Sequence, residues 1–319
     1  MRKNIFAKEI NKDGMEIHDH FVVTKKGTFS SKNNTKYMSI ELKDRTGVIE
    51  GKVWDNVDEA SRLFEKNDLV SVKAKSRLYQ EKPQLIITDI RKVENMVSLE
   101  DMSEFFPEGE TGIDKLKKEY FQLLNEINDP HIASVFSSLT GRHDILEKFI
   151  SFPASIGVHH VYMGGLLEHS LSIANMGKYV ADKVGVNKDI IIAGCLLHDI
   201  GKVEEIQVRG GFRYSDRGRL MGHIALGVII FEELIKDIKD FPEHIADILA
   251  HIIISHHGVE EWGSPKKPMS IEALVVHYLD DLDAKVMGVK EHMKDNMADE
   301  KWTEYHKLYE SRFYKLPER

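Results

Sequence analysis

The chain has 319 residues and a formal net charge of −8, with 42% hydrophobic and 30% charged residues, which is typical of a globular protein of two domains. Its longest apolar run, residues 190–197, is far shorter than the roughly 20 residues that cross a bilayer, and its first residues contain no apolar stretch. We therefore expect neither a membrane-spanning helix nor a signal peptide. One cysteine, Cys195, excludes an intramolecular disulfide and indicates a reducing, cytoplasmic environment.

Charge is distributed unevenly along the chain. Residues 1–95 contain 19 Lys and Arg against 15 Asp and Glu, a balance of +4, and the remainder has a balance of −12. This difference is consistent with a polyanion-binding module beside a carboxylate-rich site, although a balance of +4 is also within ordinary variation.

The first 97 residues are predicted to form a small β-barrel. Apolar and polar residues alternate in "KYMSIELKD" (36–44), and a turn, "DRTG", leads to a second alternating run, "VIEGKVWD" (48–55). Two more runs follow at 69–79 and 84–93, and a short helix is predicted over 57–65. Several short strands with one helix between them in under 100 residues favour an OB-type barrel.

Residues 98–112 carry acidic residues, Pro and Gly without periodicity, and are predicted to be a linker. Residues 113–319 are predicted to form an all-α bundle with a C-terminal helical tail, because apolar residues recur at helical spacing. One exception, "VEEIQVRGGFRYSDRG" (203–218), is predicted to be a projecting hairpin. The aromatic stretch 302–315 is expected to pack against the helical domain or another subunit. The helices are expected near 113–127, 131–139, 142–151, 161–184, 188–201, 221–237, 242–257 and 270–294.

Histidine and aspartate recur in the helical part, each beside apolar residues or glycine. One such histidine is usually an ordinary hydrogen-bonded core residue, but burying six or seven ionisable groups without partners would cost several kcal/mol each. A shared cation removes that cost. Cys195, three residues before the His-Asp doublet, is interpreted as a buried core thiol rather than a ligand. The set comprises His169, the doublet His198–Asp199, His223, the doublet His256–His257, and Asp280.

This order of residues, H…HD…H…H…D, resembles the metal-dependent phosphohydrolases of the HD superfamily. The resemblance implies that Asp199 bridges two divalent metal ions. One ion would be bound by His169, His198, Asp199 and Asp280. The other would be bound by Asp199, His223 and His256, with His257 as the alternative to His256. Asp281 and Asp283 are alternatives to Asp280. Imidazole and carboxylate ligands suit Mn, Fe, Co, Ni or Zn, and two such ions can activate water and neutralise the charge on a phosphoester.

A longer match lies just before the first of these ligands. The string "SFPASIGVHHVYMGGLLEHS" (151–170), followed by "HDIGK", resembles the YhaM family of bacterial 3′-5′ exoribonucleases, which combines an OB domain with an HD domain. The resemblance covers nearly the whole chain. It implies an enzyme, usually associated with manganese, that removes 5′-mononucleotides from the 3′ end of single-stranded RNA or DNA.

Further residues fit a phosphodiester substrate. Lys202 is a candidate for a phosphate contact or is a lysine at a helix C-terminus. His159 and His160 are candidates for contacts with the scissile phosphate, or only position their loop. Arg209, Arg213, Arg217 and Arg219, assigned to the hairpin, are candidates for backbone contacts. In the barrel, Tyr37, Trp54, Phe29 and Tyr79 are candidates for base stacking, with Lys25, Lys26, Lys32 and Lys36 following the phosphates. The competing interpretation assigns at least two of these aromatic residues to the barrel core.

Two other functions compete with the exonuclease. HD proteins also hydrolyse small or cyclic nucleotides, but "HHGVEEWGSPKKP" lacks the Gly-Tyr-Pro of the cyclic-di-GMP phosphodiesterases, and a small nucleotide needs no barrel. A non-catalytic single-strand-binding replication factor is disfavoured because none of the six metal-ligand positions is missing. The sequence does not decide whether RNA or DNA is the preferred substrate. It also leaves the oligomeric state open and is compatible with a homo-oligomer.

Overall fold

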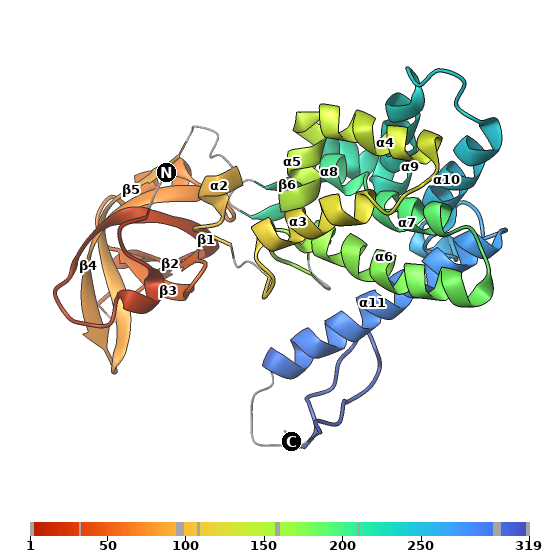
Figure 1. Ribbon diagram of the computed structural model, residues 1–319. Coiled ribbons are helices and arrows are strands. Elements are labelled where there is room, and N and C mark those ends of the chain that lie inside the picture. Colours follow the sequence, from red (N-terminus) through yellow and green to blue (C-terminus); the bar gives the residue numbers. More distant parts are fainter. Residues whose placement is uncertain are drawn as a thin grey trace. The chain divides into compact units, whose positions relative to one another are not determined.

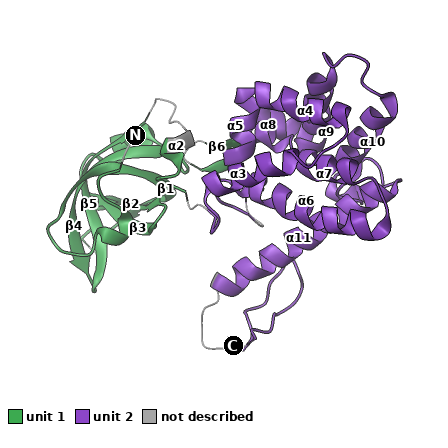
Figure 2. Ribbon diagram, viewed as in Figure 1, with its two compact units in different colours: residues 1–108, 207–213 green, residues 109–206, 214–319 purple. Residues whose placement is uncertain are grey.

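The computed structural model describes residues 3–31, 33–93, 99–106, 109–156, 160–208, 211–295 and 301–316 (Figure 1). The chain forms two compact units (Figure 2). The first comprises the described parts of 1–108 and 207–213, and the second comprises those of 109–206 and 214–319. Within the described ranges, no helix combines the length and the apolar character that a membrane span requires.

The first unit is a closed five-stranded barrel with the strand order β1-β2-β3-β5-β4. All neighbouring pairs are antiparallel except β3 with β5, which is parallel. A short helix, α1, lies between β3 and β4 in sequence. The OB-type barrel predicted from the alternating runs is therefore confirmed. The elements are η1 (Ala7–Glu9), β1 (Glu16–Ser30), β2 (Lys36–Asp44), β3 (Gly47–Val53), α1 (Val57–Leu63), β4 (Leu69–Tyr79) and β5 (Lys82–Lys92).

Side-chain alternation decides which residues fill the barrel. In β2, Met38, Ile40 and Leu42 are fully buried in the core, while the residues between them are only partly covered. Lys3 is also buried, between the carboxylates of Asp19 and Asp44, at 3.7 and 3.4 Å from one oxygen of each. Burial lowers the pKa of Lys3, and the two carboxylates oppose this change.

The described residues of the segment predicted as a linker include a short helix and buried apolar side chains, which differs from the prediction. A short helix, α2 (Leu99–Met102), is followed by Phe105 and Phe106, which are buried. The Phe106 ring lies 4.6 Å from the Phe212 ring, and both residues belong to the first unit. A lack of periodicity over 98–112 therefore did not mean a lack of packing, because these apolar residues cover the barrel unit.

The second unit is a helical bundle, as predicted. Capping residues set several of its helix ends. The Asp129 carboxylate accepts hydrogen bonds from the His131 and Ile132 amides at the start of one helix. The Asn187 side chain accepts from two backbone amides in the same way at the start of the helix that begins at Lys188. The helices are α3 (Ile113–Leu124), α4 (Pro130–Gly141), α5 (His143–Ser151), α6 (Gly165–Val184), α7 (Lys188–Leu197), α8 (Lys202–Glu205), α9 (Asp216–Ile235), α10 (Glu243–Ser255), η2 (Glu260–Trp262) and α11 (Ile271–Asp295).

Two segments differ in detail from the prediction. The hairpin is confirmed as β6 (Ile206–Val208) and β7 (Phe212–Tyr214), but Arg217 and Arg219 lie in the first turn of α9 and not in the hairpin. The predicted helical tail is wrong for residues 301–316. This segment folds back on itself through the bridges Trp302–Tyr314 and His306–Ser311, because its backbone groups pair across the turn.

Candidate metal centre

The six predicted metal ligands come together in the helical unit. His169 lies in α6, His198 and Asp199 follow the end of α7, and His256 follows α10. His223 and Asp280 are contributed by α9 and α11. All six side chains are buried or nearly so. Residues more than 100 positions apart in the sequence therefore form one cluster.

Asp199 lies between two sets of histidines. Its Oδ2 is 3.2 Å from His198 Nε2 and 3.8 Å from His169 Nε2. Its Oδ1 is 3.5 Å from His223 Nε2 and 3.6 Å from His256 Nε2. Each carboxylate oxygen thus faces a different pair of imidazole nitrogens, which is the arrangement that a bridging carboxylate requires.

Asp280 completes the first set. Its Oδ1 lies 3.1 Å from His169 Nε2 and 3.8 Å from His198 Nε2, and one ligand atom from each of these three residues lies within 4.8 Å of the others. Asp281, one of its alternatives, instead accepts a hydrogen bond of 2.8 Å from Lys285 Nζ. The structure therefore brings Asp280, and not Asp281, into the cluster.

Unpaired polar atoms in this cluster are the groups that a bound cation would satisfy. Among the described residues, four buried side-chain atoms at the centre lack a hydrogen-bond partner: His198 Nε2, Asp199 Oδ1, His223 Nε2 and His256 Nε2. Unsatisfied buried polar groups are rare in native proteins because each costs roughly 1–3 kcal/mol. Nitrogen and oxygen donors that converge in this way fit divalent transition metals.

Each of the four histidines is oriented by a hydrogen bond at its other ring nitrogen. His198 Nδ1 and His256 Nδ1 each lie 2.8 Å from a backbone carbonyl, of Cys195 and Ile253 respectively. A carbonyl only accepts, so these Nδ1 atoms carry the proton and leave Nε2 free to bind a metal. His169 and His223 bond in the same way to the carboxylates of Asp283 (2.7 Å) and Glu205 (3.2 Å).

His257 joins the second set without replacing His256. Its Nδ1 lies 2.6 Å from the Trp262 carbonyl, and ligand atoms of His223, His256 and His257 lie within 4.8 Å of one another. The His256–His257 doublet therefore supplies two imidazoles to the same region. The sequence offered them as alternatives, whereas the structure brings both together.

Glycines adapt the backbone around His223. Helix α9 is broken at Gly222, whose φ of 70° and ψ of 158° lie outside the helical region and favour glycine. Gly201 of the "HDIGK" string packs directly against the His223 carbonyl, and a Cβ on Gly201 would collide with that oxygen. These two positions let α9 approach the His-Asp doublet closely enough for His223 to face Asp199.

Asp283 and Glu205 are two further functional candidates. The sequence offered Asp283 only as an alternative to Asp280, and it did not single out Glu205. Asp283 Oδ2 accepts from His169 Nδ1 (2.7 Å) and pairs with His160 Nε2 (3.1 Å), while Oδ1 accepts from Ser172 Oγ (2.6 Å). The pattern does contain a signal, because Asp280 and Asp283 are three residues apart and share one face of α11. Glu205 gave no comparable signal.

Lys202 and His160 are both engaged with this cluster. Lys202 Nζ donates a hydrogen bond of 2.6 Å to Asp199 Oδ2. Burial lowers the pKa of Lys202, but Asp199 outweighs it and raises the pKa, so the pair is ionic. The predicted helix over 188–201 ends at Leu197, so Lys202 is not a solvated lysine at its C-terminus. His160 is buried, with its ring nitrogens 2.6 Å from Tyr162 Oη and 3.1 Å from Asp283 Oδ2.

Cys195 is a core residue, as predicted. Its side chain is fully buried, and burial raises the pKa of its thiol. None of the metal-ligand clusters among the described residues includes this thiol. Cys195 contributes to the centre only through its carbonyl.

The aromatic candidates of the barrel are on its surface, so their assignment to the core is wrong. Tyr37 and Trp54 stack with ring centroids 4.8 Å apart, and the Phe29 ring is 5.8 Å from that of Tyr37. None of these three side chains, nor that of Tyr79, is buried. Lys52 Nζ lies 5.2 Å from the Tyr37 ring centroid and adds a positive charge.

A groove of about 920 Å³ extends from Phe29 over the outer surface of the barrel. Predicted lysines along the barrel are partly neutralised: Lys36 pairs with Asp58, and Lys25 with Glu41 at 2.9 Å. Lys32 lies outside the described residues. Even so, the combination of exposed rings and ammonium groups is typical of surfaces that bind single strands. Lys26 Nζ already donates a 2.7 Å hydrogen bond to the Ser61 carbonyl. The groove is lined in part by Lys25, Lys26, Lys66 and Lys82, together with Glu41 and Glu50.

The described arginine candidates belong to two different elements. Arg213 lies in β7, whereas Arg217 and Arg219 lie in α9, and Arg217 NH1 lies 3.6 Å from a Glu204 carboxylate oxygen. His159 and Arg209 lie outside the described residues. Of the three described arginines, Arg213 is therefore the one in the hairpin.

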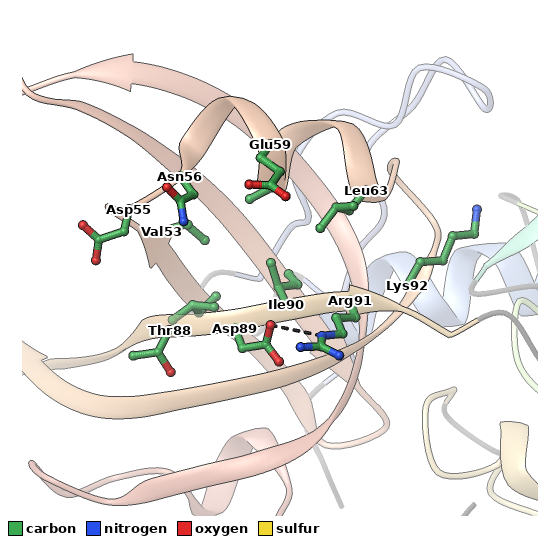
Figure 3. Close-up of a pocket in the computed structure, with 12 residues that line it drawn as sticks. Val53, Asp55, Asn56, Glu59, Leu63, Thr88, Asp89, Ile90, Arg91 and Lys92 are labelled. Carbon is green, nitrogen blue, oxygen red and sulfur yellow. Dashed lines mark hydrogen bonds and ion pairs between the residues drawn. The ribbon is translucent and has the colours of Figure 1, made fainter.

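A second cavity of the barrel, about 500 Å³ in volume, lies beside α1 (Figure 3). Its wall includes Asp55, Glu59 and Asp89, and the Asp89 carboxylate accepts a 3.2 Å hydrogen bond from Arg91 Nε. It contains none of the predicted nucleic-acid or metal residues. Its wall also carries Arg91 and Lys92, so the charges there are mixed, and we assign the cavity no function.

Comparisons with known proteins agree with both units. A model of the OB-fold nucleic acid binding domain matches residues 21–93, and a model of the HD domain matches residues 166–285. The 3′-5′ exoribonuclease YhaM of Bacillus subtilis is 31% identical over 99% of this chain and 98% of the relative. The chain belongs to the YhaM family. The YhaM protein of Bacillus velezensis is also 31% identical, over 90% of each chain.

One solved structure resembles the barrel. The second OB-fold domain of replication protein A from Methanococcus maripaludis is 24% identical and covers 30% of this chain and 98% of its own length, with a TM-score of 0.23. The strand order of the barrel, and not this likeness, carries the OB assignment. The YhaM match extends over both units and includes the C-terminal segment beyond the HD domain.

Proposed function

We propose that this YhaM-family chain is a metal-dependent 3′-5′ exoribonuclease that hydrolyses single-stranded RNA, and single-stranded DNA as well, to 5′-mononucleotides. The observation that carries the proposal is Asp199, whose two oxygens face two separate pairs of imidazole nitrogens. The exoribonuclease activity for which the relatives are named, together with both domains, supports the substrate class.

The residues divide into two ligand sets. His169, His198, Asp199 and Asp280 would bind one divalent ion, and Asp199, His223 and His256 would bind the other, with His257 beside them. We propose Mn²⁺ as the resident metal, with Fe, Co, Ni and Zn as chemically suitable substitutes. When bound, such a pair supplies an activated water at neutral pH and neutralises charge on the reacting phosphoryl group.

The surrounding residues hold this arrangement in place. Lys202 neutralises Asp199 from one side and fixes the carboxylate through its hydrogen bond to Oδ2. His160 bonds to Asp283, which in turn bonds to His169 Nδ1. The sequence offered His160 either as a contact with the scissile phosphate or as a residue that only positions its loop. Its two engaged ring nitrogens support a positioning role for His160 through Asp283.

The barrel supplies affinity for a single strand. Tyr37, Trp54 and Phe29 present faces on which bases stack without sequence preference, and the neighbouring lysines attract phosphates. This favours a polymer over a mononucleotide as substrate. The proposal also includes a cytoplasmic location, where single-stranded RNA is available, and a homo-oligomeric state.

The test uses a single-stranded RNA labelled at its 5′ end, incubated with the purified protein and Mn²⁺. We expect a ladder that shortens from the 3′ end, release of 5′-mononucleotides, and no reaction in EDTA. An RNA that stays intact, or one cut internally, would overturn the proposal. Hydrolysis of added mononucleotides by a preparation that leaves the RNA intact would instead indicate a small-nucleotide phosphohydrolase.

A further inference from the structure

Helix α11 presents an apolar face that the described residues of its own unit leave exposed. Its inner face carries Asp280 and Asp283 toward the metal centre. At 100° per residue, five exposed apolar residues lie within about 60° of one line on the opposite side of the helix. Soluble proteins seldom leave such a continuous apolar stripe in water unless it is an interaction surface. The stripe consists of Ile271 (55% exposed), Leu274 (42%), Tyr278 (65%), Leu282 (49%) and Val286 (48%).

We propose that this stripe binds the same stripe of a second copy of the chain, with the two α11 helices antiparallel. The spacing of the residues supports this geometry. Tyr278 and Leu282 are equally far from position 280, as are Leu274 and Val286, and as are Ile271 and the half-buried Val289. An antiparallel pair with its two-fold axis at position 280 would therefore place each of these apolar residues at the level of another apolar residue on the partner. A two-fold interface requires this self-complementarity.

Charge does not oppose the pairing. Of the described residues on this face, only Lys285 is charged, and its Nζ donates a 2.8 Å hydrogen bond to Asp281 at the edge of the stripe. Each protomer thus brings a charge that is already neutralised. A partner protein of strong charge would find no matching groups here, whereas an apolar copy of the same helix fits.

The C-terminal segment extends the apolar surface. It packs against the second half of α11, where His292 Nε2 lies 2.9 Å from the Glu304 carbonyl and Gly288 leaves room for the Tyr309 ring. Its outward side chains stay exposed. Those with the largest exposed fractions are Trp302 (52%), Tyr305 (52%), Leu308 (62%), Tyr314 (42%) and Leu316 (81%).

The available area matches a stable dimer. These ten side chains each expose about half of their surface or more, which amounts to on the order of 1,000 Å² because aromatic side chains alone offer about 150–250 Å² each. A standard protein interface buries about 800 Å² on each partner. The surface is large enough for self-association when the exposed side chains of residues 301–316 face the partner together with the stripe.

The first test compares molar mass by light scattering for the wild-type protein, Leu282→Asp and the control Leu63→Asp. Leu63 is similarly exposed, at 47%, but lies on α1 of the barrel. We expect wild type and control at twice the chain mass of 36.6 kDa, and Leu282→Asp at the chain mass. A wild type at the single-chain mass, as expected if the chain's own barrel or an unrelated protein covers the stripe, would overturn the proposal. A Leu282→Asp variant that still has twice the chain mass would also overturn the proposal.

The second test needs no destabilising charge and reports on the direction of pairing. In the double variant Ile271→Cys/Val289→Cys, both new thiols lie on the centre line of the stripe and each faces its counterpart on the partner, so mild oxidation should yield a covalent dimer. Neither single variant should cross-link, because the two copies of one position would lie about 27 Å apart along the helices, far beyond disulfide reach. The native Cys195 is buried and does not interfere. No cross-link in the double variant, or equal cross-linking in the singles, would contradict antiparallel pairing.

Discussion

Replacing Asp283 by Asn tests whether the residues behind the ligands control metal binding. Three donors converge on the Asp283 carboxylate: Ser172 Oγ on one oxygen, and His169 Nδ1 and His160 Nε2 on the other. Burial raises the pKa of Asp283, but the hydrogen bonds from His160 and His169 outweigh it and hold the pKa well below its usual range. The carboxylate is therefore ionised and only accepts.

Asparagine keeps the volume of Asp283 but offers one oxygen and one NH₂ group. At least one of the three donors would then face another donor, and the ring of His169 would lose its fixed tautomer or orientation. Disrupting such a partner of a metal-bound histidine typically costs 10–100-fold in metal affinity, about 1.4–2.7 kcal/mol. We expect this loss for the site formed by His169, His198 and Asp280.

The assay is a calorimetric titration of the metal-free protein with Mn²⁺, followed by RNA hydrolysis at increasing Mn²⁺. Asp283→Asn should bind metal 10–100-fold more weakly and recover part of its activity at high Mn²⁺. The matched control is Asp281→Asn, because Asp281 faces Lys285 at the edge of the outer face. Wild-type affinity in Asp283→Asn, or an equal loss in the control, would refute the reasoning.

Three further predictions concern the two units separately. Asp199→Ala should abolish RNA hydrolysis while single-strand binding, followed by fluorescence anisotropy, stays near the wild-type value; wild-type turnover would disprove the bridging role. Trp54→Ala should weaken single-strand binding by about 1–3 kcal/mol, because it removes a stacking ring, without slowing hydrolysis of a small phosphodiester. The last concerns pH. Burial lowers the pKa of His169, but its hydrogen bonds to Asp280 and Asp283 outweigh this and raise the pKa to about 9 in the metal-free protein. Because the pKa of His169 is higher in the folded than in the unfolded protein, its protonation stabilises the fold. This stabilisation is complete at pH values below the unfolded-state pKa of about 6.5 and is lost as the pH rises through about 9. Melting curves in chelator should show that loss in the wild type and a smaller one in His169→Gln.

The parts of the fold that local patterns control could be predicted from the sequence. Alternation in residues 36–44 identified the buried faces of a strand, and the same alternation places Tyr37 out of phase with Met38 and therefore on the surface. The exposure of this aromatic residue was thus available in the pattern. The C-terminal segment was not predictable in this way, because aromatic residues at helical spacing pair equally well across the bridges that the segment forms.

The candidate centre was predictable only as a set of ligands. The order of His and Asp residues identified Asp199 and the five groups that meet around it. The supporting groups depend on tertiary contacts that sequence spacing does not encode: Glu205 meets His223 only because α9 breaks at Gly222, and His257 joins the second set through the Trp262 carbonyl. The exact helix ends decide which ring nitrogen faces inward, and periodicity fixes those ends poorly.

The most direct test of the bridging role of Asp199 is anomalous diffraction from crystals grown with Mn²⁺. We predict two anomalous peaks about 3.5–4 Å apart, one on each side of the Asp199 carboxylate. One peak should be bounded by His169, His198 and Asp280, and the other by His223 and His256. A single peak, or two peaks that do not share Asp199, would contradict the account.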